Sequence, residues 1–372
     1  MKTEKNNINI IYVGRYNEGE ILSGPEKTAK RIFDEHSKKS RSIFIQYFFD
    51  GKKYRLKQKL FGITKKQSSD NSVVYTLGIF KAIYLLKDIK PEIIHIITFE
   101  RFAIIFFIYK LFSKVKIVYN EHGVVTYENY ELKKLPYVKK FKDKICEKIF
   151  LKYSDKIIFT SEKTIDIAEI YFNINESKSV ILANGVDEVF YSSSKTKVND
   201  SVLKAVFIYK NELYKPGLIF LKKFIENFKE HLDIHIISKE SIDLKNEGNA
   251  HIHFIKQMET DELANFYKDK DIFLSLNNYD TFSISTAEAM ASGLIPIITK
   301  ETGISRYIEN AHNGFLVDFG NINQLKDTIM KVAGMNSDKR TAILQNSINV
   351  YEYLAWDKIY ETYTNIYKSI LK

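Results

Sequence analysis

The segment from Asp280 to Ile297, D-T-F-S-I-S-T-A-E-A-M-A-S-G-L-I-P-I, holds the residues best suited to chemistry. Asp280 and Glu288 are carboxylates eight positions apart, the first in a predicted loop and the second on a predicted helix. The loop follows the strand-like run D-I-F-L-S-L, and a doubly wound sheet binds ligands where such strands end. The helix N-terminus would offer backbone N–H groups to a phosphate or sugar oxygen, and Glu288 could accept both hydroxyls of a ribose. The alternative is a surface aspartate before an ordinary capped helix, and these residues alone do not decide between the two.

The elements around this segment follow the pattern of a doubly wound α/β protein, with short β-branched runs between longer helical stretches. In the first half we expect strands at Ile8–Val13, Ser42–Phe49, Ile93–Thr98, Lys116–Glu121, Lys156–Thr160 and Ser179–Leu182. Helices are expected at Pro25–Lys38, Phe99–Phe112 and Leu135–Tyr153.

The pattern restarts after a polar, serine-rich break at Tyr191–Ser201. Strands are then expected at Lys204–Tyr209, Asp233–Ser238, His251–Ile255, Asp271–Leu276, Leu294–Thr299 and Gly314–Val317. Helices are expected at Gly217–Lys229, Asp261–Lys268, Ser285–Ser292, Ser305–Asn310 and Asn323–Val332, and the tail Val350–Leu371 has the spacing of one long amphipathic helix.

These patterns divide the chain of 372 residues into two Rossmann-like domains. We expect an N-terminal domain at 1–190, a linker at 191–201, a C-terminal domain at 202–350 and a final helix at 351–372 that packs back on the first domain. Two such domains facing each other form a cleft, and small ligands usually bind in such clefts.

Composition narrows the class of protein. With 45% hydrophobic and 14% aromatic residues, the chain can bury two cores. Cys146 is the only cysteine, which excludes a disulfide and a cysteine-based metal cage. The apolar run Phe102–Phe112 is too short for a membrane span and is interpreted as a core helix. The basic N-terminus leads straight into a strand pattern, so we expect no secretory signal and a cytoplasmic location.

The net charge of +10 fits a solubility bias, nucleic-acid binding or attraction to an anionic membrane. Lysines and apolar residues alternate along Leu132–Lys156, a pattern typical of a helix that lies on an anionic membrane surface. The same pattern fits a packed helix with a solvated lysine face, and both interpretations stay open. Nucleic acid is not expected, because the lysines do not align with aromatic platforms and no binding motif is present.

Other titratable residues have structural interpretations. Asp269-Lys-Asp271 has the D-x-D form of some metal-dependent sugar transferases, but it falls at a helix-to-strand junction. His251 and His253 share a strand face without a third ligand, so no metal site is expected. His95 fits a strand-end cleft position or simple packing.

The whole pattern resembles family 4 retaining glycosyltransferases, whose E-x7-E signature is similar to Asp280–Glu288 followed by A-M-A-S-G-L-I-P-I. Further matches follow in the order of that family: Ser23-Gly24, Pro91–Thr98, Lys116–Gly123, Ser154–Ser161, the N-G-V-D-x-x-F element within Val180–Phe190, and the C-terminal W-D-K-I-Y-E-T-Y. The resemblance covers almost the whole chain and is weakest at 50–90 and 191–250.

The resemblance implies a GT-B fold, in which two Rossmann-like doubly wound domains face each other across a cleft. It also implies roles for single residues. Glu288 would hold the ribose of a nucleotide sugar, and Asp280 would contact hydroxyls of the transferred sugar. Lys215, in Y-K-P-G, and Lys210 would meet the diphosphate, where fixed cations stabilise the charge that develops on the leaving group.

Further positions complete the site that the resemblance implies. His122 would lie near the reacting face of the sugar, and it joins Asp280 and Lys215 as a catalytic candidate. Donor-binding candidates besides Glu288, Lys210 and Lys215 are Phe282, Ser283, Ile284 and Gly24, the last of which would let backbone approach a phosphate or the acceptor. Transfer would proceed by front-face displacement with retention, without a metal, and no side chain presents itself as a covalent nucleophile.

Five positions depart from the family pattern. Asp280 is one methylene shorter than the usual glutamate, and Thr281 and Ser283 stand where glycines are usual. Lys210 replaces an arginine and so offers a point charge instead of a planar fork, and Ser23 replaces a loop glycine. These departures leave the identity of the donor open.

We therefore expect a retaining, hexosyltransferase-type enzyme that moves a sugar from a nucleoside-diphosphate sugar to a saccharide or lipid-linked acceptor in bacterial surface polysaccharide synthesis. It would need no cofactor, and it would lie in the cytoplasm or peripherally on the inner face of the membrane. A GT-B nucleotide-sugar epimerase and a non-catalytic nucleotide- or carbohydrate-binding subunit are the alternatives.

Overall fold

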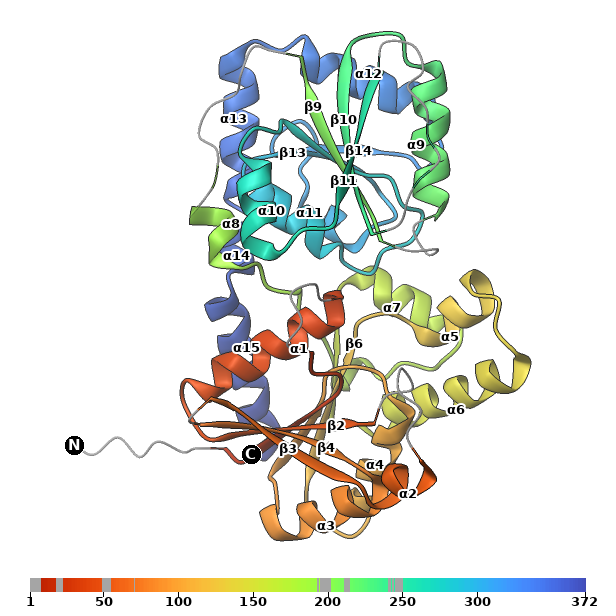
Figure 1. Ribbon diagram of the computed structural model, residues 1–372, viewed down its shortest axis with the longest axis vertical. Helices are drawn as coiled ribbons and strands as arrows, with labels where there is room; N and C mark the ends of the chain where they lie inside the picture. Colours follow the sequence, from red (N-terminus) through yellow and green to blue (C-terminus); the bar gives the residue numbers. More distant parts are fainter. Residues whose placement is uncertain are drawn as a thin grey trace, which may run out of the picture. The chain divides into compact units, whose positions relative to one another are not determined.

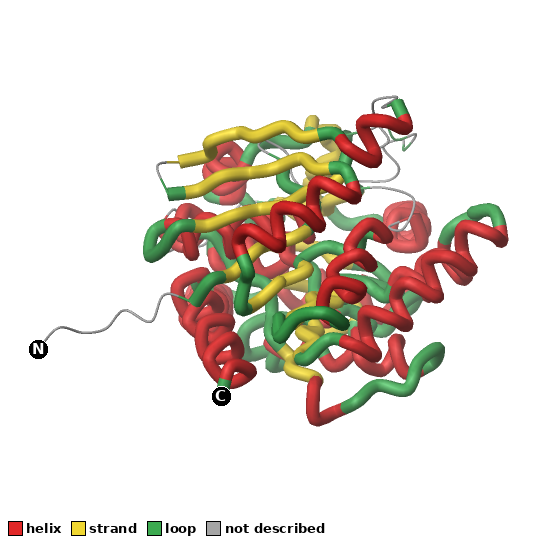
Figure 2. Tube along the Cα trace, turned by 90° about the horizontal axis from the view of Figure 1, so that it is seen from below, coloured by secondary structure: helices red, strands yellow, loops and turns green. Residues whose placement is uncertain are grey.

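The computed structural model describes residues 8–17, 23–48, 55–69, 71–192, 194, 202–210, 215–239, 242, 244 and 250–372. The chain forms two compact units, each with a largely or wholly parallel sheet between helices (Figures 1 and 2). Unit 1 comprises Met1–Leu182 and Ile359–Lys372, and unit 2 comprises Ala183–Lys358. No helix in the described part of the chain has both the length and the apolar character that a membrane crossing requires.

Unit 1 holds an eight-stranded sheet in the order β3-β4-β2-β1-β5-β6-β7-β8. All neighbouring strands are parallel except the β3–β4 pair. The strands are β1 Ile10–Val13, β2 Ser42–Tyr47, β3 Ile63–Ser69, β4 Ser72–Leu77, β5 Ile93–Ile96, β6 Lys116–Glu121, β7 Lys156–Phe159 and β8 Ser179–Ile181.

The helices of unit 1 cover both faces of this sheet. They are α1 Gly24–Ser37, α2 Leu56–Phe61, α3 Ile79–Ile89, α4 Ile104–Lys110, α5 Val125–Tyr127, α6 Tyr137–Tyr153, α7 Glu162–Glu169 and most of α15 Trp356–Leu371. Side chains of a strand alternate between faces. Ile94 and Ile96 of β5 therefore pack in one core with α3, α4 and α6, whereas His95 contacts α15 on the other face.

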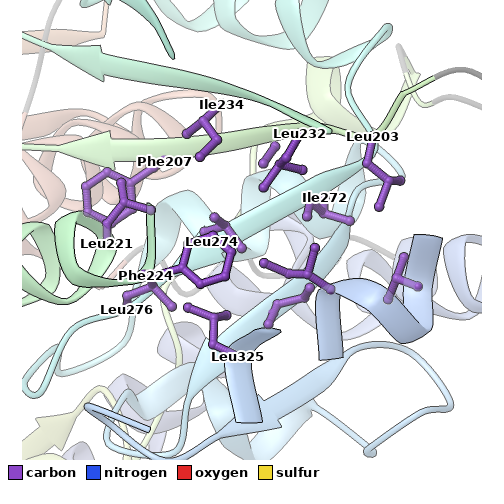
Figure 3. Packing of buried hydrophobic residues seen from close by; sticks show 14 of the residues in the cluster. Leu203, Phe207, Leu221, Phe224, Leu232, Ile234, Ile272, Leu274, Leu276 and Leu325 are labelled. Carbon is purple, nitrogen blue, oxygen red and sulfur yellow. The ribbon is translucent and has the colours of Figure 1, made fainter. Parts of the chain in front are cut away.

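Unit 2 holds a six-stranded, fully parallel sheet in the order β11-β10-β9-β12-β13-β14. The strands are β9 Lys204–Tyr209, β10 Leu232–Ser238, β11 Ala250–Lys256, β12 Ile272–Ser275, β13 Ile295–Thr299 and β14 Phe315–Val317. The helices are α8 Glu188–Ser192, α9 Lys215–Asn227, α10 Thr260–Tyr267, α11 Ile284–Ala291, α12 Ile322–Ala333, α13 Ser337–Ile348 and α14 Tyr351–Leu354. Figure 3 shows the core between strands and helices, where Phe207 and Leu274 meet Leu221 and Phe224 of α9.

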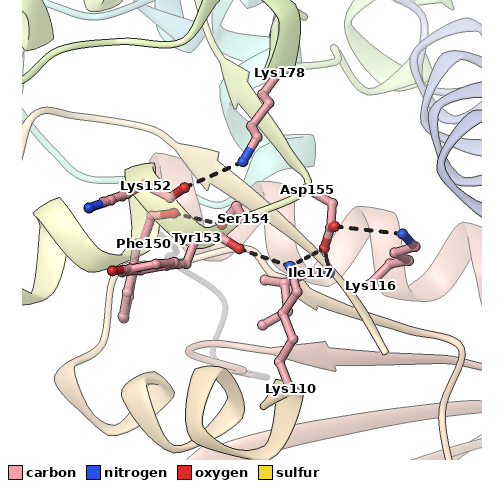
Figure 4. A network of polar contacts seen from close by, with 9 residues as sticks. All are labelled: Lys110, Lys116, Ile117, Phe150, Lys152, Tyr153, Ser154, Asp155 and Lys178. Atoms are coloured by element: carbon pink, nitrogen blue, oxygen red, sulfur yellow. Dashed lines mark hydrogen bonds and ion pairs between the residues drawn. The ribbon is translucent and has the colours of Figure 1, made fainter. Parts of the chain in front are cut away.

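An aspartate ties neighbouring strands together at the amino edge of each sheet. In unit 1, Oδ2 of Asp155 accepts the Ile117 N–H at 2.7 Å and Lys110 Nζ at 2.6 Å (Figure 4). In unit 2, Oδ2 of Asp271 accepts the Lys204 N–H at 2.9 Å. Asp269 pairs with the side chains of Lys204 and Lys270. The D-x-D carboxylates of the sequence therefore make structural contacts beside the start of β12.

Several elements differ from the sequence-based expectation. The hairpin β3–β4 and helices α2 and α3 fill residues 56–89, where we predicted no element, and α13 was also missed. The predicted tail helix from Val350 is two helices, because the extended backbone of Ala355 (ψ 137°) separates α14 from α15. Of the predicted linker 191–201, residues 193 and 195–201 lie outside the described residues.

The division between the units falls after Leu182, eight residues before the predicted end of the first domain. The reason is packing, because Val186 and Phe190 are buried in a core cluster of unit 2 together with Leu354. The Val186 N–H also donates to the Leu354 carbonyl at 2.7 Å. A Cβ on Gly185 would lie 2.4 Å from the Trp356 ring, so this close contact requires glycine in the N-G-V-D element.

Buried polar side chains join α15 to the sheet of unit 1. His95 Nδ1 lies 2.8 Å from the Tyr367 hydroxyl and His95 Nε2 lies 2.9 Å from Asn120 Oδ1. Asn120 Nδ2 in turn donates to the Tyr363 hydroxyl at 2.7 Å. Burial lowers the pKa of His95 to about 3, so the ring is neutral and Nε2 carries the proton that Asn120 accepts. Of the two interpretations of His95, the structure favours packing.

The pKa of His95 predicts a pH dependence of stability. The folded state keeps the ring neutral, while the unfolded chain protonates near the ordinary pKa of about 6.5. The free energy of unfolding should therefore fall as pH decreases from about 6.5 towards 4, by roughly 1.4 kcal/mol per pH unit for this one proton. In urea unfolding at several pH values, His95→Gln should show a shallower slope. His251→Gln, at an exposed position, is the control, and equal slopes for His95→Gln and the wild type would contradict the prediction.

Candidate functional site

The carboxyl edge of the unit 2 sheet brings the predicted donor-site residues together. Lys210 directly follows β9, and Asp280 lies in the loop after β12, the neighbouring strand. The loop leads into α11, which begins at Ile284. The charge of Lys210 is close enough to Asp280 to favour its ionised form. The predicted ligand-binding edge of the sheet thus carries a cation and a carboxylate beside a helix N-terminus.

The side chain of Asp280 holds the loop in place. Its Oδ1 accepts the N–H groups of Phe282 at 3.1 Å and Ser283 at 2.8 Å. Its own carbonyl accepts the Gly303 N–H at 2.8 Å. Burial raises the pKa of Asp280, while Lys210 and the two backbone amides oppose that shift. One carboxylate oxygen of Asp280 therefore accepts hydrogen bonds from the protein backbone, a contact that the sequence did not indicate.

Ser283, the residue before α11, adopts a left-handed conformation with φ 68° and ψ 71°. This is a position where the family pattern has glycine, and glycine reaches that conformation without steric cost. Here the Asp280 carboxylate accepts the Ser283 N–H, and Ser283 Oγ lies 2.8 Å from Thr286 Oγ1. Those contacts hold a non-glycine residue in the conformation that starts the helix.

Replacing Asp280 with alanine should lower the free energy of unfolding by about 2 kcal/mol, because two partly buried amides lose their acceptor. Asp280→Asn keeps an oxygen at Oδ1 and should be affected less. Urea unfolding of both variants measures the difference. If Asp280→Ala were as stable as the wild type, the carboxylate would not be holding the loop.

Glu288 lies in the second turn of α11 and is only 5% exposed. All eight residues of this helix are buried. Burial raises the pKa of Tyr267 well above its ordinary value, and the charge of Glu288 adds to that effect. Glu288 is therefore a carboxylate shielded from bulk water, where hydrogen bonds to it are stronger than at the surface.

Lys215 is the first residue of α9, where a cation is unfavourable for the helix dipole unless an anion binds nearby. The helix starts close to the Asp280 loop: a Cβ on Gly217 would lie 2.4 Å from Asn277 Oδ1 and 2.9 Å from the Leu276 carbonyl oxygen. Gly217 thus permits the first turn of α9 to pack on the segment that follows β12. Tyr214 of the Y-K-P-G element lies outside the described residues.

His122 and Gly24 belong to unit 1. His122 lines a pocket of about 1050 Å³ at the carboxyl ends of β1, β2, β5 and β6, and burial lowers its pKa to about 4. Gly24 opens α1 between Ser23 and Pro25, which also line the pocket. Ser23 donates its N–H and hydroxyl to Glu26 Oε2 at 3.0 and 2.7 Å, and these contacts fix the start of the helix.

Ion pairs join six of the charged residues in the walls of this pocket. Arg15 pairs with Glu100, Arg101 Nε lies 3.3 Å from Asp143 Oδ1, and Lys133 Nζ lies 2.5 Å from Glu128 Oε2. Amide and aromatic side chains fill the rest of the lining, with Asn17, Gln46, Tyr16, Tyr47 and Phe99 among them. A site of this composition suits an uncharged polar ligand better than a diphosphate.

The sequence-based reasoning missed Glu121, a carboxylate that lines the same pocket and is 1% exposed. Burial and the nearby charge of Glu147 raise its pKa well above the ordinary value. Glu147 accepts the N–H groups of Val125 at 2.6 Å and Thr126 at 2.8 Å, and burial raises its pKa to about 7. The one available signal was the position of Glu121 directly before His122 at the end of a predicted strand.

Within the described ranges, no three His, Cys, Asp or Glu side chains cluster as metal ligands would. His253 stacks on His235 with ring centroids 4.7 Å apart, and His251 is exposed on the same strand. His253 therefore packs against another imidazole ring, and His251 faces solvent.

Two family models match the chain. The model described as "Glycosyltransferase Family 4" matches residues 62–190, and the model described as "Glycosyl transferases group 1" matches residues 238–352. Together they match more than half of the chain. The second includes α11 with Glu288 and the Asp280 loop, and the first includes His122.

The individual proteins that resemble this chain are also glycosyltransferases or share its fold. A glycosyltransferase of Methanocaldococcus jannaschii is 25% identical over 62% of this chain and 65% of its own length. Sucrose-phosphate synthase from Thermosynechococcus elongatus superposes with a TM-score of 0.76 at 11% identity, over 98% of this chain and 99% of that one. HepE of Anabaena, solved in complex with UDP-glucose, gives a TM-score of 0.70 at 14% identity over 97% and 99%. At these identities the two solved structures establish the fold.

Proposed function

Because the chain belongs to the group 1, family 4 glycosyltransferases and has their GT-B fold of two Rossmann-like units, we propose that it transfers a sugar from a nucleoside-diphosphate sugar to a saccharide or lipid-linked acceptor. The observation that carries this proposal is the carboxyl edge of the unit 2 sheet. A buried carboxylate, a helix N-terminus and two lysines lie there on neighbouring elements. The complex of HepE with UDP-glucose supports a nucleotide sugar as donor.

In this proposal the nucleotide binds along α11. Glu288 accepts the two ribose hydroxyls, since a shielded carboxylate binds a diol strongly. Lys210 and Lys215 bind the diphosphate, and the first-turn N–H groups of α11, from Ile284 onward, add the positive end of the helix next to Ser283. Phe282 is 1% exposed, so it supports the loop from the core instead of touching the donor.

The geometry of Asp280 sharpens its role. Its Oδ1 holds the Phe282 and Ser283 amides, and we propose that Oδ2 accepts a hydroxyl of the transferred sugar. We propose that Asp280 positions the α11 N-terminus and makes at most a single-oxygen contact to the sugar. Asp280 has a shorter side chain than glutamate, and one of its oxygens already accepts two amides. We therefore expect it to discriminate less between sugars that differ at that hydroxyl than a glutamate at this position would.

The chemical step forms a bond between the acceptor oxygen and the anomeric carbon and breaks the bond from that carbon to the phosphate oxygen. Negative charge builds up on the leaving diphosphate, and Lys210, Lys215 and the α11 amides stabilise it without rearrangement. We propose that the reaction retains the anomeric configuration, is a hexosyl transfer and needs no metal, since the cations of the chain neutralise the leaving group.

The pocket of unit 1 is proposed to bind the acceptor. Its paired charges, amides and aromatic rings fit a polyhydroxyl ligand, and His122 is neutral at physiological pH because its pKa is about 4. A neutral imidazole can accept a hydrogen bond from a hydroxyl. A saccharide of bacterial surface polysaccharide synthesis is consistent with this lining.

A thermal-shift screen with uridine, guanosine and adenosine diphosphate sugars tests the donor assignment. A ligand that binds only the folded state raises Tm, so the preferred nucleotide should stand out. The absence of any shift with all three nucleotides would reject the donor site. Product analysis then separates the classes: a transferase consumes donor in proportion to acceptor, an epimerase converts donor without acceptor, and a binding subunit shifts Tm but turns nothing over.

A further inference from the structure

One face of the unit 1 sheet carries helices whose outer surfaces are unusually apolar. Helices α3, α4 and α6 pack side by side on this face and share one core beneath them. We call them, with the two residues that follow α4, the helix layer. Its exposed large apolar side chains are Phe80, Tyr84, Ile108, Leu111, Phe112, Tyr137, Val138, Phe141, Ile145 and Tyr153. Phe112 is 85% exposed, Leu111 78% and Tyr137 70%, so neighbouring elements do not cover them.

Helix α6 shows the arrangement most clearly. Cys146, Phe150 and Leu151 face the core, as a packed helix requires. A second apolar stripe, Tyr137, Val138, Phe141 and Ile145, faces solvent at helical spacing. The two interpretations of this basic segment therefore both describe part of it: one side is packed, and the other side exposes apolar residues among lysines.

The charges of the helix layer are almost all of one sign. Lysines in the three helices are Lys81, Lys87, Lys110, Lys139, Lys140, Lys142, Lys144, Lys148 and Lys152, of which Lys110 pairs with Asp155. The acidic residues of α6, Asp143 and Glu147, are buried against unit 1. α4 has no acidic residue, so Asp88 of α3 is the one exposed carboxylate of the three helices. The outer surface is both apolar and strongly basic.

Unit 2 provides an internal comparison. The exposed large apolar residues that the structure describes in unit 2 are Tyr191, Val202, Ile219, Phe254, Met330 and Tyr353. They are distributed over different elements, among them α8, α9, β11, α12 and α14. Singly exposed apolar residues of this kind are ordinary on a protein surface, whereas a contiguous apolar face marks an interaction site.

We infer that the helix layer of unit 1 docks on an anionic lipid bilayer. Lysines at its surface would meet the anionic headgroups, while Phe112, Phe141 and their neighbours insert at the boundary with the acyl chains. A groove of about 940 Å³ between α3 and α4 adds to this fit, since Ile108 and Phe112 form its apolar wall. Its charged lining is mostly basic, with Lys87, Lys90, Lys114 and Lys116 against one carboxylate, Glu92.

Other occupants fit the surface less well. A second copy of this chain would present the same positive face, and like charges would repel across the contact. Nucleic acid would pair with the lysines but would leave Ile108, Leu111, Val138 and Ile145 without an apolar partner. A bilayer satisfies both the cations and the branched aliphatic side chains.

Flotation of the full chain with vesicles tests the inference. The chain should float with phosphatidylcholine vesicles that contain about one third phosphatidylglycerol, and far less with phosphatidylcholine alone, because polybasic surfaces need anionic lipid. The variant Phe112→Ser/Phe141→Ser should bind about tenfold more weakly or worse. The variant Lys142→Glu/Lys148→Glu/Lys152→Glu should lose about a hundredfold.

Matched variants on unit 2 serve as controls. Phe254→Ser/Tyr353→Ser and Lys222→Glu/Lys223→Glu/Lys331→Glu remove the same residue types from exposed positions outside the helix layer and should float like the wild type. No flotation of the wild type, equal flotation with both vesicle types, or an equal loss in the controls would overturn the inference. Retention on RNA or DNA without vesicle binding would assign the surface to nucleic acid instead. The thermal shift with the donor is measured on the same proteins and should be unchanged in all of them, so failure of docking is distinguishable from failure of the proposed function.

Discussion

Replacing Glu288 with alanine is expected to lower kcat/KM for sugar transfer by about 10²–10³-fold. The change removes two charge-assisted hydrogen bonds to the donor ribose, and bonds of this kind contribute roughly 1.5–3 kcal/mol each. The carboxylate is 5% exposed, so water replaces it poorly. Initial rates at varied donor concentration measure the effect, which should appear mainly as a higher KM because the ribose stays bound throughout the reaction.

Two further variants separate binding from folding. Glu288→Gln keeps the size of the side chain and one acceptor, and should retain more activity than alanine. Glu309→Ala removes an exposed carboxylate of the same unit and should behave like the wild type. Circular dichroism melting of Glu288→Ala would show whether the fold is intact. Unchanged turnover in a folded Glu288→Ala protein would refute the donor site.

The double variant Lys210→Ala/Lys215→Ala should lower kcat by about 10³-fold. Removing one preorganised group that stabilises developing charge commonly costs 10²–10³ in kcat, and here both cations near the leaving diphosphate are lost. The charge on the diphosphate grows in the transition state, so kcat should fall more than donor affinity. Single-turnover rates with saturating donor measure the chemical step directly.

Lys222→Ala/Lys223→Ala is the matched control, because it removes two exposed lysines from the same helix, α9, beyond its first turn. It should leave kcat unchanged. If the double variant at Lys210 and Lys215 lost donor affinity while its saturated rate stayed normal, the lysines would bind the diphosphate without assisting its departure. A normal rate and a normal affinity together would exclude both residues from the site.

Much of the fold could be predicted from the sequence where buried parallel strands give continuous apolar runs. Lys116–Glu121 and Lys204–Tyr209 were predicted with their observed bounds, and most other strands within a residue or two. The hairpin β3–β4 was missed because the edge strand Ile63–Ser69 reads I-T-K-K-Q-S-S, with no apolar alternation. The break between α14 and α15 depends on the pairing of Ala355 with Val186. It could not be predicted from the sequence, because the apolar spacing continues through Ala355.

The candidate site shows the same limit at the level of single side chains. Spacing and resemblance placed Asp280, Glu288, Lys210 and Lys215 at one sheet edge, and the structure puts them there. The sequence could not show that one carboxylate oxygen of Asp280 accepts two backbone amides, because that contact depends on the loop geometry. The predicted core helix Phe102–Phe112 was wrong in part, because Ile108, Leu111 and Phe112 are exposed. An apolar run alone does not reveal which of its sides faces water.

The return of Ile359–Lys372 into unit 1 has a consequence for synthesis on the ribosome. Tyr363 and Tyr367 complete the polar contacts of His95 and Asn120, yet they are translated after all of unit 2. At about 5–20 residues per second, roughly 10–35 s separate the two parts of unit 1. Unit 2 is one continuous segment, whereas unit 1 is complete only when Ile359–Lys372 has also left the ribosome. Until then the nascent first unit has an open sheet face around His95 and Asn120, and we expect chaperones to bind there.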